Sequence, residues 1–282
     1  MIVAHEPICG DQDASELAID LALARSVVYR TLSLGFHETK GENREWLTSA
    51  TARQGLTAAA DVVDSVSGDV EPILPAALGL VDVLGAGTRD GAATYQHLFG
   101  HTAQGLVCPY ETEYGLDALF QQPQALADIA GYYLAFGLRG ESRAGHRVDH
   151  VGCECEFMDF LSRKEAMMLE LSSDPQIAEQ DDHRETLEQT RLAARKFMRD
   201  HLNRFGRAFA TRLVKEAKGG FFGALGALLF SLLGSESARF RIPAGSISLE
   251  LRSTAPEDVP MGCGTGQELI QIQRRVPATE RH

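Results

Sequence analysis

The feature that most constrains the fold is an apolar stripe near the N-terminus that repeats with the period of an α-helix. Its members recur at intervals of three or four residues: Leu17, Leu21, Ala24, Val28 and Leu32. This spacing places the five side chains on one helical face, so it predicts a helix with one buried side. Asp13 and Glu16 suit its N-terminal cap, and Gly35 suits its end. We expect this helix to span about residues 14–34.

Helical patterns continue along most of the chain. Further helices are expected at 43–67, 73–85, 94–99, 123–137, 150–172, 181–217 with a bend at Gly206, and 221–233. Only the segment SISLELRS, residues 246–253, alternates apolar and polar side chains as a strand does. One short strand near 246–252 does not make a sheet. The sequence therefore predicts an all-α fold, a single compact helical domain over residues 1–282 with about eight to ten helices.

The end of the chain differs in composition from the rest. The residues after Pro256 carry two more prolines, Pro260 and Pro277, together with glycines and charged side chains. Terminal segments of this kind are poorly ordered unless something ties them down. Residues 254–282 are therefore expected to form a mobile tail.

The balance of charges and cysteines narrows the class of protein. Lys and Arg number 27 against 39 Asp and Glu, which gives a formal net charge of −12. Because nucleic acid is held mainly by Lys and Arg, no nucleic acid is expected as a partner. The negative field would attract cationic partners, or simply keep the protein soluble. The five cysteines are an odd, scattered set, which fits free thiols in a reducing cytoplasm better than a secreted disulfide framework.

Membrane insertion is not expected. The first residues, MIVAHEPICGDQD, have no basic stretch followed by a long apolar run, so they do not resemble a signal peptide. The longest uncharged apolar run, Phe221 to Leu233, is too short to span a bilayer as a helix. A buried core helix is the better interpretation of this run.

The segment HRVDHVGCECEFM, residues 146–158, concentrates side chains that bind metals or perform acid–base chemistry. Asp149 is a suitable N-cap for a helix that begins beside it. On that helix Cys153 and Cys155 point about 200° apart, so both cannot bind one metal ion. Cys155 is then expected in the core, as a small buried apolar residue.

Two other chemistries stay open at this point. One is a metal-binding protein or enzyme that uses His150, Cys153 and a distant cysteine, either Cys108 or Cys263, although structural zinc needs four ligands. The other is nucleotide binding by the glycine-rich stretch 262–266, which no clear strand precedes and no lysine follows.

Five stretches in order resemble one known family. They are ARSVVYRTLSLGF (24–36), YQHLFGHTAQGLVCPYETEYG (95–115), ALADIAGYYLAFGL (125–138), VDHVGCECEFMDFLSRKEA (148–166) and FMRDHLNRFGRAFATRL (197–213). Together they are similar to the maturation chaperones of molybdenum enzymes, such as those of trimethylamine-N-oxide, dimethyl-sulfoxide and nitrate reductases. The form PYETEY, with Asp-His followed by EFM, is most similar to chaperones of the type II dimethyl-sulfoxide-reductase family. Phe205 stands where Trp is usual, and His146 and Arg147 replace a frequent Glu-Pro pair.

The resemblance implies a cytoplasmic, non-catalytic, all-α protein without a cofactor of its own. Its partner would be the apo catalytic subunit of a molybdenum oxidoreductase, often recognised by its twin-arginine signal peptide and held for insertion of the molybdopterin guanine dinucleotide. The oligomeric state, monomer or homodimer, stays open. The residues that carry the motif over, and that are predicted to contact the client, are Tyr110, Glu111, Tyr114, Asp149 and His150. Carboxylates of this set, with Glu113, could bind guanidinium groups, and the tyrosine rings could stack on them.

Overall fold

The structure, a computed structural model, describes residues 9–37, 41–68, 70, 72–87, 92–100, 105–115, 121–138, 146–173 and 181–252. Within these residues the regular secondary structure is helical and no strand forms. This confirms the prediction of an all-α fold. The described residues belong to one compact unit, Met1–Arg252. The predicted tail 254–282, with the glycine-rich stretch 262–266, lies outside the described residues.

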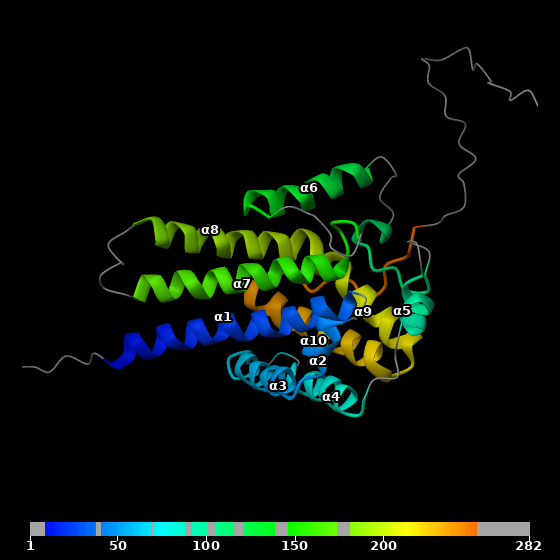
Figure 1. Cartoon of the computed structure of the whole chain (residues 1–282). Helices are drawn as coiled ribbons and strands as arrows, with labels where there is room; N and C mark the ends of the chain where they lie inside the picture. The colour runs from blue at the N-terminus through cyan, green and yellow to red at the C-terminus, as the bar shows by residue number, and fades with distance from the viewer. Residues whose placement is uncertain are drawn as a thin grey trace, which may run out of the picture. The chain divides into compact units, whose positions relative to one another are not determined.

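The helices are shown in Figure 1. Their bounds are α1 Cys9–Phe36, α2 Glu42–Thr48, α3 Ala50–Asp64, α4 Leu74–Gly85, α5 Ala92–Phe99, α6 Gln122–Ala135, α7 Val151–Ser173, α8 Asp181–Phe197, α9 Asn203–Ala217 and α10 Gly220–Phe240. Two single turns complete them, the 3₁₀ turn η1 at Glu111–Glu113 and the π-helical turn η3 at Met198–Leu202.

The frame is two long helices, α1 and α7, which lie side by side (Figure 1). Helix α3 packs on the other side of α1, and α8 packs on α7, while α10 lies against α9, α4 and α1. The predicted stripe on α1 is fully buried at Val28 and Leu32, whereas Leu17, at its start, is 45% exposed. Edge-to-face aromatic contacts such as Phe36–Phe209, with ring centroids 5.3 Å apart, join α1 to α9 in the core.

Two predicted helices are divided in the structure. The expected helix 43–67 is interrupted at Ser49, whose hydroxyl accepts a hydrogen bond from Ala52 N at 3.1 Å and so caps α3. The expected helix 181–217 is divided by the π-helical turn η3, and not at Gly206, where a bend was predicted. Gly206 lies inside α9 instead, where a Cβ atom would stand 2.7 Å from Leu233 Cδ1 of α10. The glycine therefore allows α9 and α10 to approach closely.

Gly206→Ala is expected to destabilise the protein. Alanine favours a helix by about 1 kcal/mol over glycine, but the clash with Leu233 should cost roughly 1–3 kcal/mol, as overpacking does. A lower midpoint of urea unfolding would measure the balance. Gly131→Ala in α6 is the matched control, because nothing lies within 4 Å of its added Cβ, and it should be neutral or stabilising. If both variants were equally stable, the close contact between α9 and α10 would be excluded.

The segment predicted as a short strand is extended but forms no strand, so that prediction is wrong. It makes one isolated antiparallel bridge, between Leu251 and Tyr114. Gly115 N donates to Glu250 O at 2.9 Å, and Arg252 N donates to Glu113 O at 2.8 Å. A lone bridge has no neighbouring strands to extend a ladder. The segment instead fixes the end of the loop that contains the predicted site.

Helix α10 is longer than the predicted span 221–233. It has 21 residues, and its length and composition would let it cross a membrane, but 72% of its most apolar window is buried inside the protein. Leu225, Leu229 and Leu232 are all fully buried. This burial agrees with the predicted role as a core helix.

Candidate functional site

Two segments far apart in the sequence, 105–115 and 146–151, are joined by their backbones. Tyr110 and His150 form an antiparallel bridge. Glu111 N donates to Asp149 O at 2.9 Å, and Val151 N donates to Pro109 O at 2.8 Å. The bridge brings the predicted Asp-His pair onto the predicted tyrosine loop, as the resemblance implied.

Tyr114 and Tyr133 hold these segments in place. The Tyr114 hydroxyl donates to Cys108 O at 2.8 Å and closes the loop, while its ring lies 5.4 Å from that of Phe205 in α9. The Tyr133 hydroxyl of α6 donates to Val148 O at 2.9 Å. Both tyrosines are buried, and burial raises the pKa of each phenol well above its ordinary value. These side chains are structural hydrogen-bond donors here.

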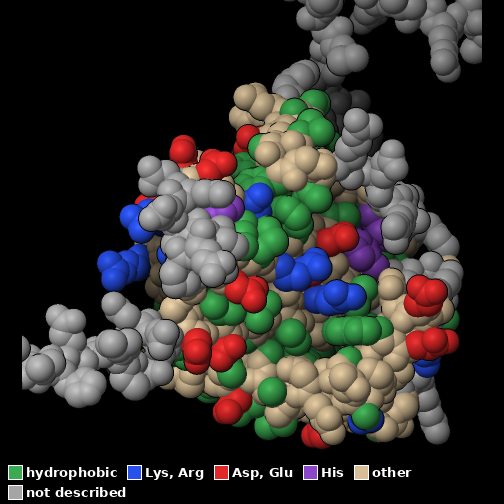
Figure 2. Space-filling model, turned by 60° about the vertical axis from the view of Figure 1, so that its left-hand side comes forward, with side chains coloured by type: hydrophobic (Ala, Val, Ile, Leu, Met, Phe, Trp, Pro, Cys, Tyr) green, Lys and Arg blue, Asp and Glu red, His purple; other side chains and the backbone are tan. Residues whose placement is uncertain are grey.

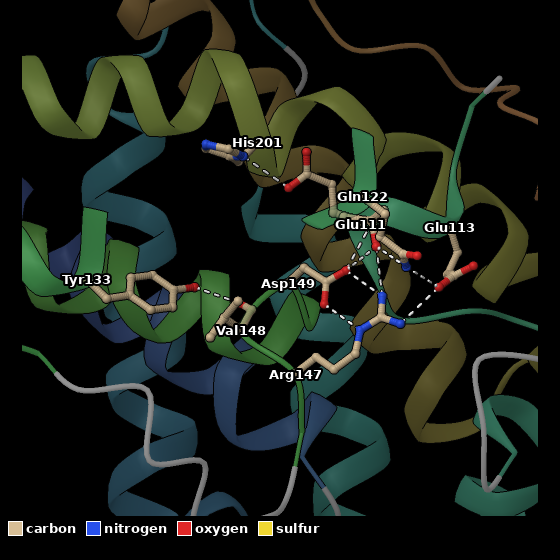
Figure 3. Close-up of polar contacts among 9 residues, drawn as sticks. Glu111, Glu113, Gln122, Tyr133, Arg147, Val148, Asp149 and His201 are labelled. Atoms are coloured by element: carbon tan, nitrogen blue, oxygen red, sulfur yellow. Dashed lines mark hydrogen bonds and ion pairs between the residues drawn. The ribbon is translucent and has the colours of Figure 1, made fainter. Parts of the chain in front are cut away.

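Asp149 is the centre of a polar cluster that we call the arginine clamp: Thr112, Glu113, Arg147 and Asp149 (Figure 3). Arg147 donates through Nε to Asp149 Oδ1 at 3.0 Å and through Nη2 to Oδ2 at 2.8 Å, a bidentate pair. Its Nη1 donates to Glu113 Oε1 at 3.0 Å. Thr112 donates to Asp149 Oδ2 from its backbone N at 3.2 Å and from its hydroxyl at 2.8 Å. One fully buried carboxylate thus ties the loop to the start of α7.

The clamp overturns the prediction that Asp149 caps a helix. Helix α7 begins at Val151, and the first-turn N–H of Gly152 donates to His150 Nδ1 at 3.0 Å. The histidine ring therefore takes the capping role. This leaves the Asp149 carboxylate for Thr112 and Arg147.

Arg147 is held on three sides. Besides the carboxylates, its guanidinium lies over the Tyr110 ring, 4.5 Å from the centroid. Burial alone would lower the pKa of Arg147, but hydrogen bonds and charges from Asp149 and Glu113 outweigh it and raise the pKa. About a third of the side chain is exposed. The site thus already contains a guanidinium bound by carboxylates and an aromatic face.

His150 lies in a stack of three imidazoles behind the clamp. Its ring centroid is 4.2 Å from that of His146 and 5.4 Å from that of His37. Burial first, then the neighbouring histidines and Arg147, lower the pKa of His150 well below its usual value. Burial likewise lowers the pKa of His37 to about 4. His37 and His150 are therefore neutral at pH 7. Gly152 makes room for the stack, since a Cβ there would stand 2.9 Å from His37 Cε1.

Glu111 points away from the clamp toward a cavity of about 670 Å³. Its Oε2 lies 3.1 Å from His201 Nδ1 of η3, and His201 Nε2 lies 3.3 Å from Asp128 Oδ2 of α6. Asp200 and Arg204 also line this cavity. The Asp128 and Asp200 side chains are 65% and 39% exposed, whereas Glu111 is 1% exposed. The cavity therefore offers the exposed carboxylate of Asp128, that of Asp200, which Arg199 already binds at 2.6 Å, and the buried one of Glu111.

Glu154, one turn into α7, is the least satisfied acid near this site. It is fully buried, and no hydrogen-bond donor among the described residues reaches either carboxyl oxygen. Burial, with the negative charges of Glu111 and Asp149, raises the pKa of Glu154 well above its ordinary value. Glu154 is therefore protonated over a pH range in which an exposed carboxyl is ionised.

The cysteines are poor candidates for metal or thiolate chemistry. Burial raises the pKa of Cys108 and of Cys153 to about 12. Cys155 is fully buried in the core, as predicted from its helical position. In the part of the chain that the structure describes, no three His, Cys, Asp or Glu side chains are grouped to hold a metal ion. Nothing in this geometry favours the metal alternative through His150 and Cys153. Its other distant cysteine, Cys263, lies outside the described residues.

The structure brings the five predicted residues into one neighbourhood, but most of them are not on the surface. Tyr110 is half-buried, while Glu111, Tyr114, Asp149 and His150 are buried. Their contact with a client stays a prediction. Sequence reasoning missed the side chains that complete the site: Thr112, Gln122, Asp128, Arg147, Glu154, His201 and Arg204. Arg147 carried the one available signal, because it departs from the family pattern.

The fold and this site define an all-α protein in which a loop and the start of a long helix are held together by a buried polar cluster. The family model of the nitrate reductase delta subunit matches residues 74–211. The match runs from α4 into α9 and includes both joined segments. This match confirms the resemblance to the maturation chaperones of molybdenum enzymes that was seen in the sequence. No curated protein matches the chain.

Proposed function

We propose that this protein is a cytoplasmic chaperone that binds the apo catalytic subunit of a molybdenum oxidoreductase before export. It recognises an arginine-bearing segment of that client, of which a twin-arginine signal peptide is the expected form. The binding keeps the client open for insertion of the molybdopterin guanine dinucleotide. The sequence pattern of the PYETEY loop favours a client of the type II dimethyl-sulfoxide-reductase family.

The observation that carries this proposal is the arginine clamp. Asp149, Glu113 and Tyr110 hold the guanidinium of Arg147 with a bidentate pair, a further charge-assisted hydrogen bond and a ring face. These are the groups that would bind an arginine of a client. The loop is therefore chemically suited to guanidinium, and Arg147 occupies the position that a client arginine would compete for.

The neighbouring cavity supplies a place for a second arginine. Asp128 and Asp200 present accessible carboxylates, and Glu111 adds a buried one at its wall. Gln122 of α6 links the two features, since its Nε2 donates to Thr112 Oγ1 and to Glu113 Oε1, both at 3.1 Å. In this proposal Tyr110 and Glu111 contact the client. The buried residues Asp149, His150 and Tyr114 hold the loop in position. The net charge of −12 would steer a cationic segment toward it.

A labelled peptide with two arginines followed by an apolar stretch tests the proposal. The double variant Asp128→Asn/Asp200→Asn should weaken its binding by about tenfold, as expected for lost charge-assisted hydrogen bonds at a partly exposed site. Fluorescence anisotropy with the full-length protein measures this change. Binding of the wild type should also fall as salt rises, because the exposed charges are screened.

The double variant Asp61→Asn/Asp82→Asn is the matched control. It removes the same charge from exposed positions in α3 and α4, so it should bind the peptide nearly as wild type does. If both double variants lost the same affinity for the peptide, the effect would come from net charge alone, and the proposed site would be rejected. Co-purification from the native host, with identification of the bound large subunit, then tests the client class.

A further inference from the structure

A second cavity lies among α1, α7, α8 and the end of α10, with a volume of about 640 Å³. It shares no lining residue with the cavity beside Glu111. Its charged lining consists of five arginines and one acid: Arg25, Arg191, Arg195, Arg239, Arg241 and Glu165. This is an unusual concentration of positive charge in a chain of net charge −12. Basic side chains also gather among hydrophobic ones on the face drawn in Figure 2.

Carboxylates hold the inner arginines rigidly. Arg239 donates to Glu165 Oε2 at 2.9 Å and to Glu236 Oε2 at 3.0 Å, and it lies over the Phe240 ring at 4.4 Å. Arg191 Nε donates to Glu165 Oε1 at 2.7 Å. Such pairs fix the guanidinium groups before any ligand arrives, which lowers the entropy cost of binding.

The charges do not balance within the cavity. Arg25 shares Glu236 with Arg239, its Nε lying 3.0 Å from Glu236 Oε1, so two carboxylates serve three arginines. Arg195 and Arg241 are exposed and make no ion pair within the described residues. The cavity therefore keeps an excess of positive charge.

Arginine is an unfavourable residue at position 241, where the backbone is left-handed. Arg241 ends α10 in the left-handed conformation, with φ 53°. Glycine or asparagine is the usual residue at such an end, and other side chains cost about 1 kcal/mol or more there. Lys218 ends α9 in the same conformation, so this backbone strain is not by itself evidence for a ligand; the relevant observation is that Arg241 places an exposed positive charge at the cavity.

We propose that this cavity binds a phosphate-bearing small molecule, a diphosphate or its organic ester. The planar guanidinium fork matches phosphate oxygens, and the volume is in the range of small-molecule sites. Leu21, Leu192 and Phe240 give the organic part an apolar wall. A small ligand is favoured over an acidic protein segment, because a long acidic segment would also be repelled by the net charge of −12 that the whole chain carries.

Calorimetric titration of the full-length protein with inorganic pyrophosphate tests this site. We expect Arg195→Gln/Arg241→Asn to weaken binding by at least tenfold. Asparagine accepts the left-handed conformation, so this variant should unfold at the same temperature as wild type or slightly higher. Loss of binding without loss of stability separates a ligand site from a structural ion-pair network.

Arg184→Gln is the matched control, since it removes an exposed arginine of α8 that does not line the cavity. It should change the affinity less than twofold. No binding at millimolar pyrophosphate, or an equal loss in the control, would overturn the proposal. So would a hexaglutamate peptide that binds as tightly as pyrophosphate, because the site would then serve a protein partner. The peptide test of the proposed client site is unaffected by any of these results.

Discussion

Asp149→Ala is expected to lower the free energy of unfolding by about 3 kcal/mol, the largest single loss in the site. The carboxylate is fully buried and accepts hydrogen bonds from Thr112 N, Thr112 Oγ1, and Nε and Nη2 of Arg147. Its removal leaves a buried backbone N–H without a partner and releases the loop from α7. For a chain of this size the thermal midpoint should fall by roughly 10 °C. Circular dichroism during heating and urea titration measure both quantities.

Arg147→Ala is the comparison that tests the geometry of the clamp. The variant leaves the buried Asp149 carboxylate with its two hydrogen bonds from Thr112, and water can enter where the one-third exposed Arg147 side chain was, so it should lose about 2 kcal/mol, less than Asp149→Ala. The double variant should lose less than the sum of the two, since the residues share one contact. If Arg147→Ala proved more harmful than Asp149→Ala, the buried carboxylate would not be the centre of the clamp.

This stability effect also changes how a functional defect at Asp149 must be interpreted. Asp149→Asn and His150→Ala are the direct variants for testing the predicted client contacts. Both residues are fully buried, and His150 also caps α7. A maturation defect in either variant therefore requires a parallel measurement of unfolding. The accessible residues Asp128 and Asp200 report on binding more directly.

The helices were predictable because their signal is local. A period of three to four residues in the sequence is the same period that the core selects, as at Val28 and Leu32 of α1. The end of α10 was missed because Gly234, Ser235 and Glu236 read as a polar stop. In the structure Glu236 is buried and bound by Tyr29, Arg25 and Arg239, so the helix continues to Phe240. Only partners from distant helices make that polar turn stable.

The candidate site was predictable in its residue types but not in its contacts. Asp149 and Tyr110 could be selected from the motif, and the structure does bring them together. The contacts of Asp149 could not be predicted, because the residue that caps α7 depends on the orientation of the His150 ring. Contacts such as His201 with Glu111 join residues that are 90 positions apart, and no periodicity encodes them. Arg147 stood out in the sequence only as a departure from the family pattern, and its contacts with Asp149 and Glu113 could not be predicted for the same reason.

Glu154→Gln is expected to stabilise the protein at alkaline pH, by about 1–3 kcal/mol at pH 8. The pKa of Glu154 is raised in the folded state above its ordinary value of 4.5. The folded chain therefore retains a proton that the unfolded chain has released. Stability from this group is fully present below pH 4.5 and is lost as pH rises toward the folded-state pKa. Glutamine cannot ionise, so it removes that loss.

The measurement is the difference in unfolding midpoint between Glu154→Gln and wild type from pH 5 to pH 8. We expect this difference to be small at pH 5 and to grow with pH, because only the wild-type carboxyl titrates. Glu170→Gln, an exposed position on the same helix, should differ from wild type by less than about 0.5 kcal/mol throughout. A difference that stayed constant with pH, or a variant less stable at pH 8, would show that Glu154 is ionised in the folded protein. The negative charges of Glu111, Asp149 and Glu154 would then lie close together, so a cation between them would be needed to offset their repulsion.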